Sequence, residues 1–207
     1  MAPRVAAGVG MSRLGRALAV LAAAIGATGC GAGTTARQAP PVDATDPRVL
    51  YPLARGHVWS YDIDTGTGTP TLSVTRVVRD DGRRVEVSNN GGPPVVYERR
   101  PQGLHRVASD TWLLRAPVRR GERWPAPGGM TAEVTADGLR VEVPAGRFEG
   151  CVRVEERGGE EGRHIRTTYC PHVGPVIVES ELALATSPEP VRVRARLLGW
   201  SFDSDAP

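Results

Sequence analysis

FEGCVRVEERGGEEGRHIRTTYCPHVGPVIVES, which runs from Phe148 to Ser180, is the stretch that decides the fold. Folding it about the midpoint of Gly159–Gly162 gives a hairpin whose opposed pairs are Val152 with Tyr169, Val154 with Thr167, and Cys151 with Cys170. Thiols opposed on neighbouring antiparallel strands have Cβ atoms about 4.5 to 5.5 Å apart, close enough to oxidise. Glu155 then lies opposite Arg166, so apolar, covalent and ionic pairings agree on one register. The sequence therefore predicts a Cys151–Cys170 disulfide across this hairpin.

Composition excludes a disordered chain and gives no support to nucleic-acid binding. The 207 residues are 40% hydrophobic, enough for one packed domain. The formal charge is +3, but three of the 26 basic residues, Arg4, Arg13 and Arg16, lie in the first 29 residues, which contain no acidic residue. The remaining basic residues equal the 23 acidic ones in number, so the rest of the chain is formally neutral.

The N-terminus has the organisation of a secretory signal. From Met11, a functional start that the sequence also allows, a short basic stretch precedes an apolar run from Ala17 to Gly26 and then small residues up to Cys30. The run spans about ten residues, whereas a membrane-spanning helix needs about 20. We therefore expect residues 1–29 to be a signal peptide and not a retained transmembrane anchor.

This arrangement resembles bacterial lipoprotein precursors, in which the signal peptidase cuts before a cysteine that follows small residues. The resemblance implies that Cys30 becomes an acylated, palmitate-bearing N-terminus held at a lipid bilayer. The alternative is an ordinary cleaved signal with a chance cysteine. Gly31 implies sorting to the outer membrane, by analogy with enteric lipoproteins. Residues 30–50, rich in proline and small residues, are predicted to be a flexible tether.

From Tyr51 onward the chain alternates apolar and polar residues with turn signals about every ten residues, which is typical of an antiparallel all-β domain. We predict this domain over 51–203, followed by a C-terminal tail at 204–207. Its expected form is a single strongly curved sheet or half-barrel of about 9 to 11 strands.

Two further hairpins are predicted from turn residues. Residues 72–78 and 83–88 join through Asp80-Asp81-Gly82, which sets Val77 against Val85. Residues 130–143 fold about Asp137-Gly138 as a type I′ turn, which sets Val134 against Val141 and, on the solvent face, Glu133 against Glu142.

One string occurs twice. PLARGHVW at 52–59 and PVRRGERW at 117–124 share the pattern Pro-apolar-x-Arg-Gly-x-x-Trp. Both direct the chain into a new strand and place a tryptophan there. The geometry of a strand start explains the repeat without a binding site, and the repeat indicates a domain built in two parts.

Short motifs over most of the mature chain resemble a large class of uncharacterised bacterial envelope lipoproteins. The matching residues are Gly56, Trp59, Tyr61, Gly121, Trp124, Pro144, Ala145, Gly146, Phe148, Cys151, Gly174 and Val176. Those proteins are similar to the half-barrel (LolA/LppX-like) carriers and lipid-binding lipoproteins, in which a curved sheet partly encloses an apolar cavity. The resemblance implies that fold and, more weakly, an apolar ligand. The lid helices of the carriers are not evident here, which argues against a carrier role.

No catalytic pattern stands out, and we expect no catalytic residue, metal or cofactor. The sequence has no G-x-S-x-G elbow, H-E-x-x-H pair, C-x-x-C motif or phosphate-binding glycine loop. The four histidines are dispersed, and His164 is expected opposite Arg157 on the solvent face.

Two other sites remain as alternatives. A metal site formed by Cys170 and His172 is an alternative to the disulfide. Arg192, Arg194 and Arg196 are either a solvated strand face balanced by acids or a site for anionic lipid.

Aromatic side chains are the remaining candidates for a site. Trp59, Tyr61, Trp112 and Trp124 either line an apolar ligand pocket or pack in the core.

The sequence thus predicts a non-catalytic, lipid-anchored β domain of the cell envelope, facing the periplasm or the cell surface. It would act as a binding or scaffold module, with a lipid or other apolar ligand as the sharper version. The alternatives are an envelope hydrolase and a purely structural protein. Oligomeric state is not predicted.

Overall fold

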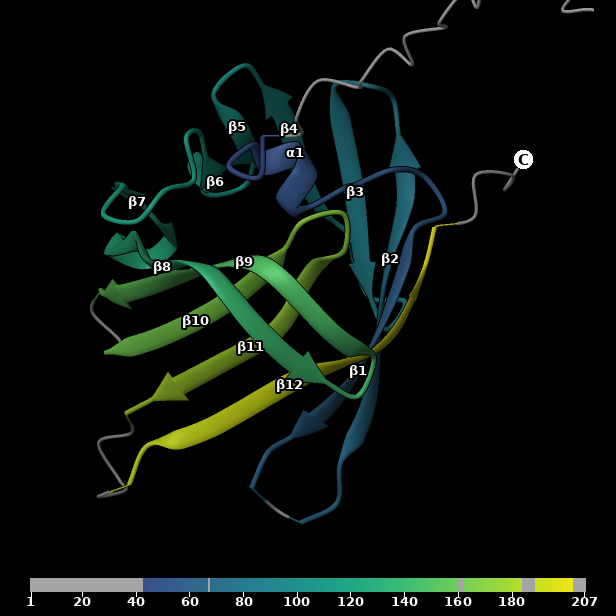
Figure 1. The fold of residues 1–207 in the computed structure, drawn as a ribbon, viewed down its shortest axis with the longest axis vertical. Coiled ribbons are helices and arrows are strands. Elements are labelled where there is room, and N and C mark those ends of the chain that lie inside the picture. The colour runs from purple at the N-terminus through teal and green to yellow at the C-terminus, as the bar shows by residue number, and fades with distance from the viewer. Residues whose placement is uncertain (1–42, 67, 160–161, 184–188, 203–207) are drawn as a thin grey trace, which may run out of the picture. The chain divides into compact units, whose positions relative to one another are not determined.

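A computed structural model describes residues 43–66, 68–159, 162–183 and 189–202 (Figure 1). The elements in chain order are α1 (Pro47–Leu50), β1 (Val58–Asp64), β2 (Thr71–Asp80), β3 (Arg84–Asn89), β4 (Val95–Arg100), β5 (Gly103–Arg106), β6 (Thr111–Arg115), β7 (Arg123–Pro125), the 3₁₀ turn η1 (Pro127–Gly129), β8 (Met130–Val143), β9 (Gly146–Gly158), β10 (Arg163–Cys170), β11 (Gly174–Leu182) and β12 (Val191–Ser201). The predicted signal peptide, Cys30, most of the tether and the tail at 204–207 lie outside these residues.

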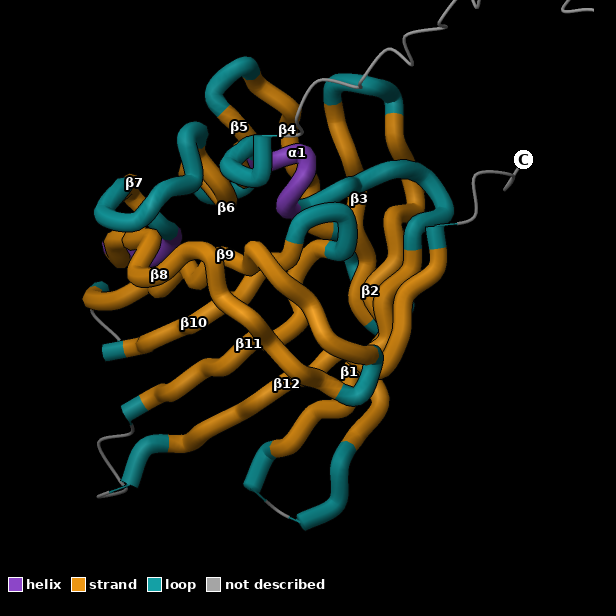
Figure 2. Tube along the Cα trace, in the orientation of Figure 1, coloured by secondary structure: helices purple, strands orange, loops and turns teal. Residues whose placement is uncertain are grey.

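All twelve strands belong to one antiparallel sheet, so the predicted all-β class is confirmed. The sheet has one strand more than the upper end of the predicted range of about 9 to 11. Strands β1 to β6 and β7 to β12 form two meanders, each pairing in chain order, and the β1–β12 pair joins them. The edge strands β6 and β7 are consecutive in the chain. Figures 1 and 2 show that the sheet curves strongly, nearly closing into a barrel, with β2 and β3 across from β9 to β11.

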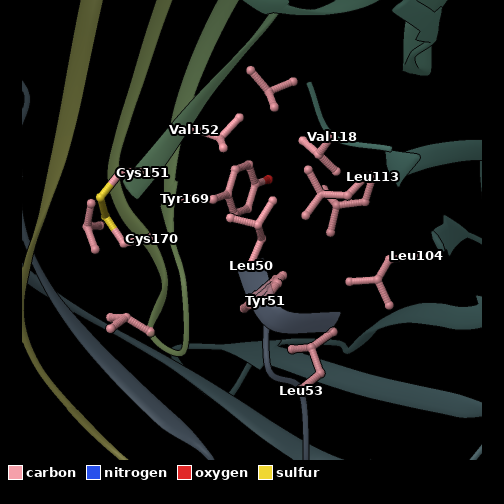
Figure 3. Packing of buried hydrophobic residues seen from close by; sticks show 14 of the residues in the cluster. Leu50, Tyr51, Leu53, Leu104, Leu113, Val118, Cys151, Val152, Tyr169 and Cys170 are labelled. Carbon is pink, nitrogen blue, oxygen red and sulfur yellow. A yellow bond between two sulfur atoms is a disulfide. The ribbon is translucent and has the colours of Figure 1, made fainter. Parts of the chain in front are cut away.

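The hairpin of β9 and β10 has the predicted register. Val152 pairs with Tyr169, Val154 with Thr167 and Glu155 with Arg166. Cys151 and Cys170 form a disulfide, with Cα atoms 4.2 Å apart, beside the buried cluster that contains Tyr169 (Figure 3). The disulfide prediction is confirmed, which removes Cys170 as a thiolate ligand for a metal.

The repeated string starts each meander in the same way. Gly56 and Gly121 both have positive φ, 84° and 91°, which glycine adopts without steric cost. Gly56 N–H donates to Val77 O and Val77 N–H to His57 O; in the second copy Gly121 pairs in this manner with Val134, and Val134 N–H donates to Glu122 O. The two-part construction predicted from sequence is therefore present in the backbone.

The predicted hairpin about Asp137-Gly138 is wrong. Residues 130–143 form one long strand, β8, which pairs with β9 along its length and deviates from regular register between Val134 and Val141. The chain turns instead between Val143 and Gly146. Asp137-Gly138 lies in the irregular part, where Gly138 has a φ of 63°. A thirteen-residue neighbouring strand outweighs the local turn preference because it pairs with both arms of the predicted hairpin.

The same finding corrects the predicted Glu133–Glu142 pair, because Glu133 lies between Arg123 on β7 and Glu155 on β9. The register predicted for β2 and β3 is also wrong. Val77 pairs with Val87 and not with Val85, because the hairpin closes at the Asp80–Val85 pair, three residues from the predicted register, and a bulge between Val77 and Arg79 reduces this difference to two. A shift of two leaves each side chain on its own face, so both valines remain buried.

Helix α1 lies in the stretch assigned to the tether. Asp46 caps it by accepting a hydrogen bond from Arg48 N, with Pro47 at the first position. Leu50 is fully buried, and Tyr51 packs edge-on against Trp59, with ring centroids 5.3 Å apart. The packed part of the chain therefore begins before residue 51, and Leu50 and Tyr51 lie within the buried cluster (Figure 3).

Candidate ligand cavity

The inner face of the sheet encloses a cavity of about 350 Å³. Its lining combines all four tyrosines of the chain, an arginine–glutamate pair, several small polar side chains and an apolar set: Ile63, Val87, Leu113, Ile165, Val178 and Ala195. The exposed side chains of Asn89 and Val95 belong to the same lining, so the cavity opens to solvent. A concave site of this size, which combines apolar and aromatic walls with polar groups, is typical of small-molecule sites.

The tyrosines give the cavity neutral aromatic walls. Tyr51, Tyr61 and Tyr169 are buried, and Tyr97 is half-buried. Burial raises the pKa of all four phenols, so they remain protonated at neutral pH. Tyr61 Oη donates to the carbonyl of Pro175 at 2.8 Å, which fixes its ring against β11.

Arg106 and Glu156 are the charged groups of the lining. Arg106 Nη2 lies 2.6 Å from Glu156 Oε1, and the exposed fractions of the side chains are 17% and 9%. Burial alone would lower the pKa of Arg106, but the charge of Glu156 and its hydrogen bond outweigh burial and raise it. The two residues therefore form a closed, charge-neutral pair in the cavity wall.

Of the four aromatic residues proposed from the sequence, Tyr61 lines the cavity, whereas the three tryptophans do not belong to the lining. Trp59 is fully buried and donates from Nε1 to Val173 O at 2.6 Å. Gly174 allows this contact, because a Cβ atom there would lie 3.1 Å from the indole nitrogen. Trp124 is buried in the core. Trp112 packs edge-on against His105 and beneath Arg100.

Among the aromatic and charged residues of the cavity, sequence reasoning missed all except Tyr61, that is Tyr51, Tyr97, Tyr169, Arg106 and Glu156. A signal for Glu156 exists, because it lies two residues beyond Val154 on the apolar side of β9. Its partner Arg106 is 50 residues away in the chain, and no local pattern connects them.

The outer face of β9 holds a separate cluster of charged and polar side chains. His164 lies opposite Arg157, as predicted, and its Nε2 is 2.9 Å from Glu155 Oε2, a contact that the sequence did not predict. Thr135 Oγ1 donates to the other carboxylate oxygen at 3.0 Å. The hydroxyl bonds to the carboxylate and not to the imidazole, so this arrangement lacks the nucleophile–base contact that acyl transfer requires.

The arginine row of β12 is paired with acids. Arg192 lies 3.5 Å from Glu181, Arg194 3.3 Å from Glu179, and Arg196 2.7 Å from Asp62. These contacts match the solvated, charge-balanced strand face and leave little positive charge for an anionic lipid.

Within the described ranges, no three His, Cys, Asp or Glu side chains gather as a metal site would require. In the same part of the chain, no helix has the length and apolar content needed to cross a bilayer.

Comparisons with known proteins give weak likenesses only. No family model and no curated protein matches the chain. A putative exported protein with YmcC-like fold from Bacteroides fragilis is 15% identical, with a TM-score of 0.45, and the match covers 73% of this chain and 98% of that one. A putative lipoprotein from Parabacteroides distasonis is 12% identical, with a TM-score of 0.33, covering 74% and 98%. At TM-scores below 0.5, neither likeness supports an inference about function.

Proposed function

We propose that this chain is a lipoprotein of the cell envelope, anchored to a bilayer through acylated Cys30, whose β domain binds an apolar or amphipathic ligand without catalysis. The signal-like N-terminus and the disulfide favour an exported, oxidising location. By the analogy drawn from Gly31, the membrane is the outer one, with the domain facing the periplasm or the cell surface.

The open cavity is the observation that carries the binding role. A scaffold domain has no need of a hollow interior, because filling it with side chains would add packing energy. Here the inner face of strands from both meanders surrounds unfilled space instead. The lining holds one carboxylate, Glu156, already paired with Arg106, and contains neither histidine nor cysteine. This composition supports binding over hydrolysis.

Calorimetric titration tests the binding role. The full chain in lipid nanodiscs is titrated with decan-1-ol, with empty nanodiscs as the blank. We expect saturable heat from the wild type and about a tenfold or greater loss of affinity in Ala195→Phe, because the ring fills the cavity. Arg194→Phe, the neighbouring position on the outer face of β12, is the matched control and should bind like the wild type. Absence of saturable heat, or equal binding by Ala195→Phe, would contradict the role.

Mass spectrometry of the membrane fraction tests the anchor independently. We expect a mature N-terminus at Cys30 carrying acyl chains, and Cys30→Ala should release the protein from the membrane or stop its maturation. An unmodified soluble form that begins at another residue would show that the anchor is wrong while leaving the cavity's role intact.

A further inference from the structure

We propose that the ligand of the cavity is a neutral, single-chain amphiphile whose polar end is a hydroxyl group, and that the Arg106–Glu156 pair excludes acidic ligands. This inference rests on the proposed binding function. It follows from three features of the cavity: its volume, its charge balance and the direction of its hydrogen bonds.

The volume limits the enclosed part of the ligand. At roughly 30 Å³ for a water-sized group, 350 Å³ holds about a dozen heavy atoms. One acyl or alkyl chain of about ten carbons with a small polar group fits this space. A diacyl lipid would have to leave most of its two chains outside. The apolar side chains of β10 to β12, among them Ile165, Val178 and Ala195, provide the surface for such a chain.

The charge balance disfavours a charged ligand. Arg106 is the cationic group of the lining and is already paired with Glu156 at 2.6 Å. A carboxylate that bound Arg106 would leave Glu156 buried without its partner, and an ammonium group at Glu156 would do the same to Arg106. Burying a charge without a partner is strongly unfavourable. A neutral ligand leaves the pair intact.

On the β1–β2 side of the cavity, three hydrogen bonds favour a donor on the ligand. Tyr61 Oη donates to Pro175 O, Ser73 Oγ to Asn90 Oδ1 at 3.3 Å, and Thr75 Oγ1 to Asn89 Oδ1 at 2.7 Å. All three hydroxyls line the cavity on β1 and β2, and each has used its proton in the protein. Each retains acceptor lone pairs. A ligand hydroxyl can donate to these oxygens, whereas a carboxylate can only accept.

Matched titrations with decan-1-ol and decanoate at pH 7 test the inference. We expect the wild type to bind decan-1-ol about tenfold or more tightly than decanoate. In Glu156→Gln the charge of Arg106 is no longer balanced, so decanoate should gain about tenfold or more relative to decan-1-ol. Glu155→Gln, the adjacent position on the outer face, is the control and should keep the wild-type preference.

A pH series with the wild type gives a second measurement if Glu156→Gln does not fold. Decanoate becomes a neutral donor when protonated, so its affinity should rise toward that of decan-1-ol as pH falls through the ligand's own pKa.

Equal or tighter binding of decanoate at pH 7, or no change of preference in a folded Glu156→Gln, would overturn the inference. If neither ligand binds at any pH, the proposed function itself fails; if both bind equally, only the choice of ligand class fails.

Discussion

Glu155 and Glu156 are neighbours on β9 and project to opposite faces of the sheet. Glu156 faces the cavity and has one close cationic partner, Arg106. Glu155 faces outward and contacts several groups: Arg157, Arg166 at 3.6 Å, His164 at 2.9 Å and Thr135 at 3.0 Å. Both side chains are about equally buried, with 9% of each exposed. The number of partners therefore distinguishes them, and burial does not.

This difference indicates different roles. The outer cluster has redundant partners, so loss of one contact leaves others in place. The inner pair has no such redundancy, and its neutrality depends on both members. The outer glutamate is therefore explained by local stability, and the inner pair by the electrostatics of the cavity.

Breaking the inner pair should have the largest effect. Glu156→Leu leaves Arg106 without its partner in the wall of the cavity, and we expect a loss of about 3 kcal/mol in the free energy of unfolding, measured in urea. Arg106→Met/Glu156→Leu removes both charges and should lie within about 1 kcal/mol of the wild type. A double variant as unstable as the single one would show that the charge balance is not the cause.

The disulfide sharpens the comparison because it fixes the register that assigns the two glutamates to their faces. Cys151 and Cys170 are separated by 19 residues, and chain-entropy arithmetic gives about 3 kcal/mol for such a loop. Cys151→Ser/Cys170→Ser should remain folded, because the hairpin is already paired, but should unfold at lower urea concentration. Reductant should have the same effect on the wild type. Two reactive thiols in the denatured, unreduced protein would mean that no disulfide forms.

The outer glutamate should give the smallest effect, with a distinct pH dependence. Burial raises the pKa of Glu155, but hydrogen bonds with His164, Arg157 and Thr135 outweigh burial and hold it below the usual 4.5. Its contribution to stability is therefore present above pH 4.5 and is lost as pH falls through the lowered pKa of the folded state.

Glu155→Gln should lower the free energy of unfolding by about 1 kcal/mol at pH 7. It should also reduce the decrease in that free energy as the pH becomes acidic. Denaturant unfolding at several pH values between 3 and 7 measures this, with Glu149→Gln, on the exposed part of the same strand, as control. If Glu155→Gln loses as much stability at acidic pH as the wild type does, other carboxylates cause that loss.

Residue patterns predict those parts of the fold in which local and cross-strand cues coincide. The β9–β10 register follows because apolar, cysteine and charged pairs all require it, and the two strand starts follow because glycine at 56 and 121 provides the same positive φ. Prediction fails where a distant strand decides the outcome, as where β9 holds β8 extended through Asp137-Gly138. It also fails where the turn differs from the one that its residues favour, as at the Asp80–Val85 pair that closes β2 and β3.

The site is less predictable than the fold for the same reason. Tyr61 lines the cavity, but aromatic character alone does not separate it from Trp59, which lies two residues earlier on the same face of β1 and is buried in the core. The difference depends on what packs against each ring: Trp59 is covered by Tyr51 and by its hydrogen bond to Val173 O, whereas Tyr61 borders the unfilled space. Likewise, Arg106 and Glu156 meet only because the two meanders face each other across the cavity.

A crystal structure of the chain grown with 10-bromodecan-1-ol tests the central claim, that the cavity is a ligand site, most directly. The bromine atom gives an anomalous signal that locates the alkyl chain. We predict a peak inside the cavity beside Ile165 and Val178, with the ligand hydroxyl within hydrogen-bond distance of Tyr61 Oη or Thr75 Oγ1. A saturated crystal with bromine only on the outer surface, and with the cavity holding water or closed by its own side chains, would contradict the account.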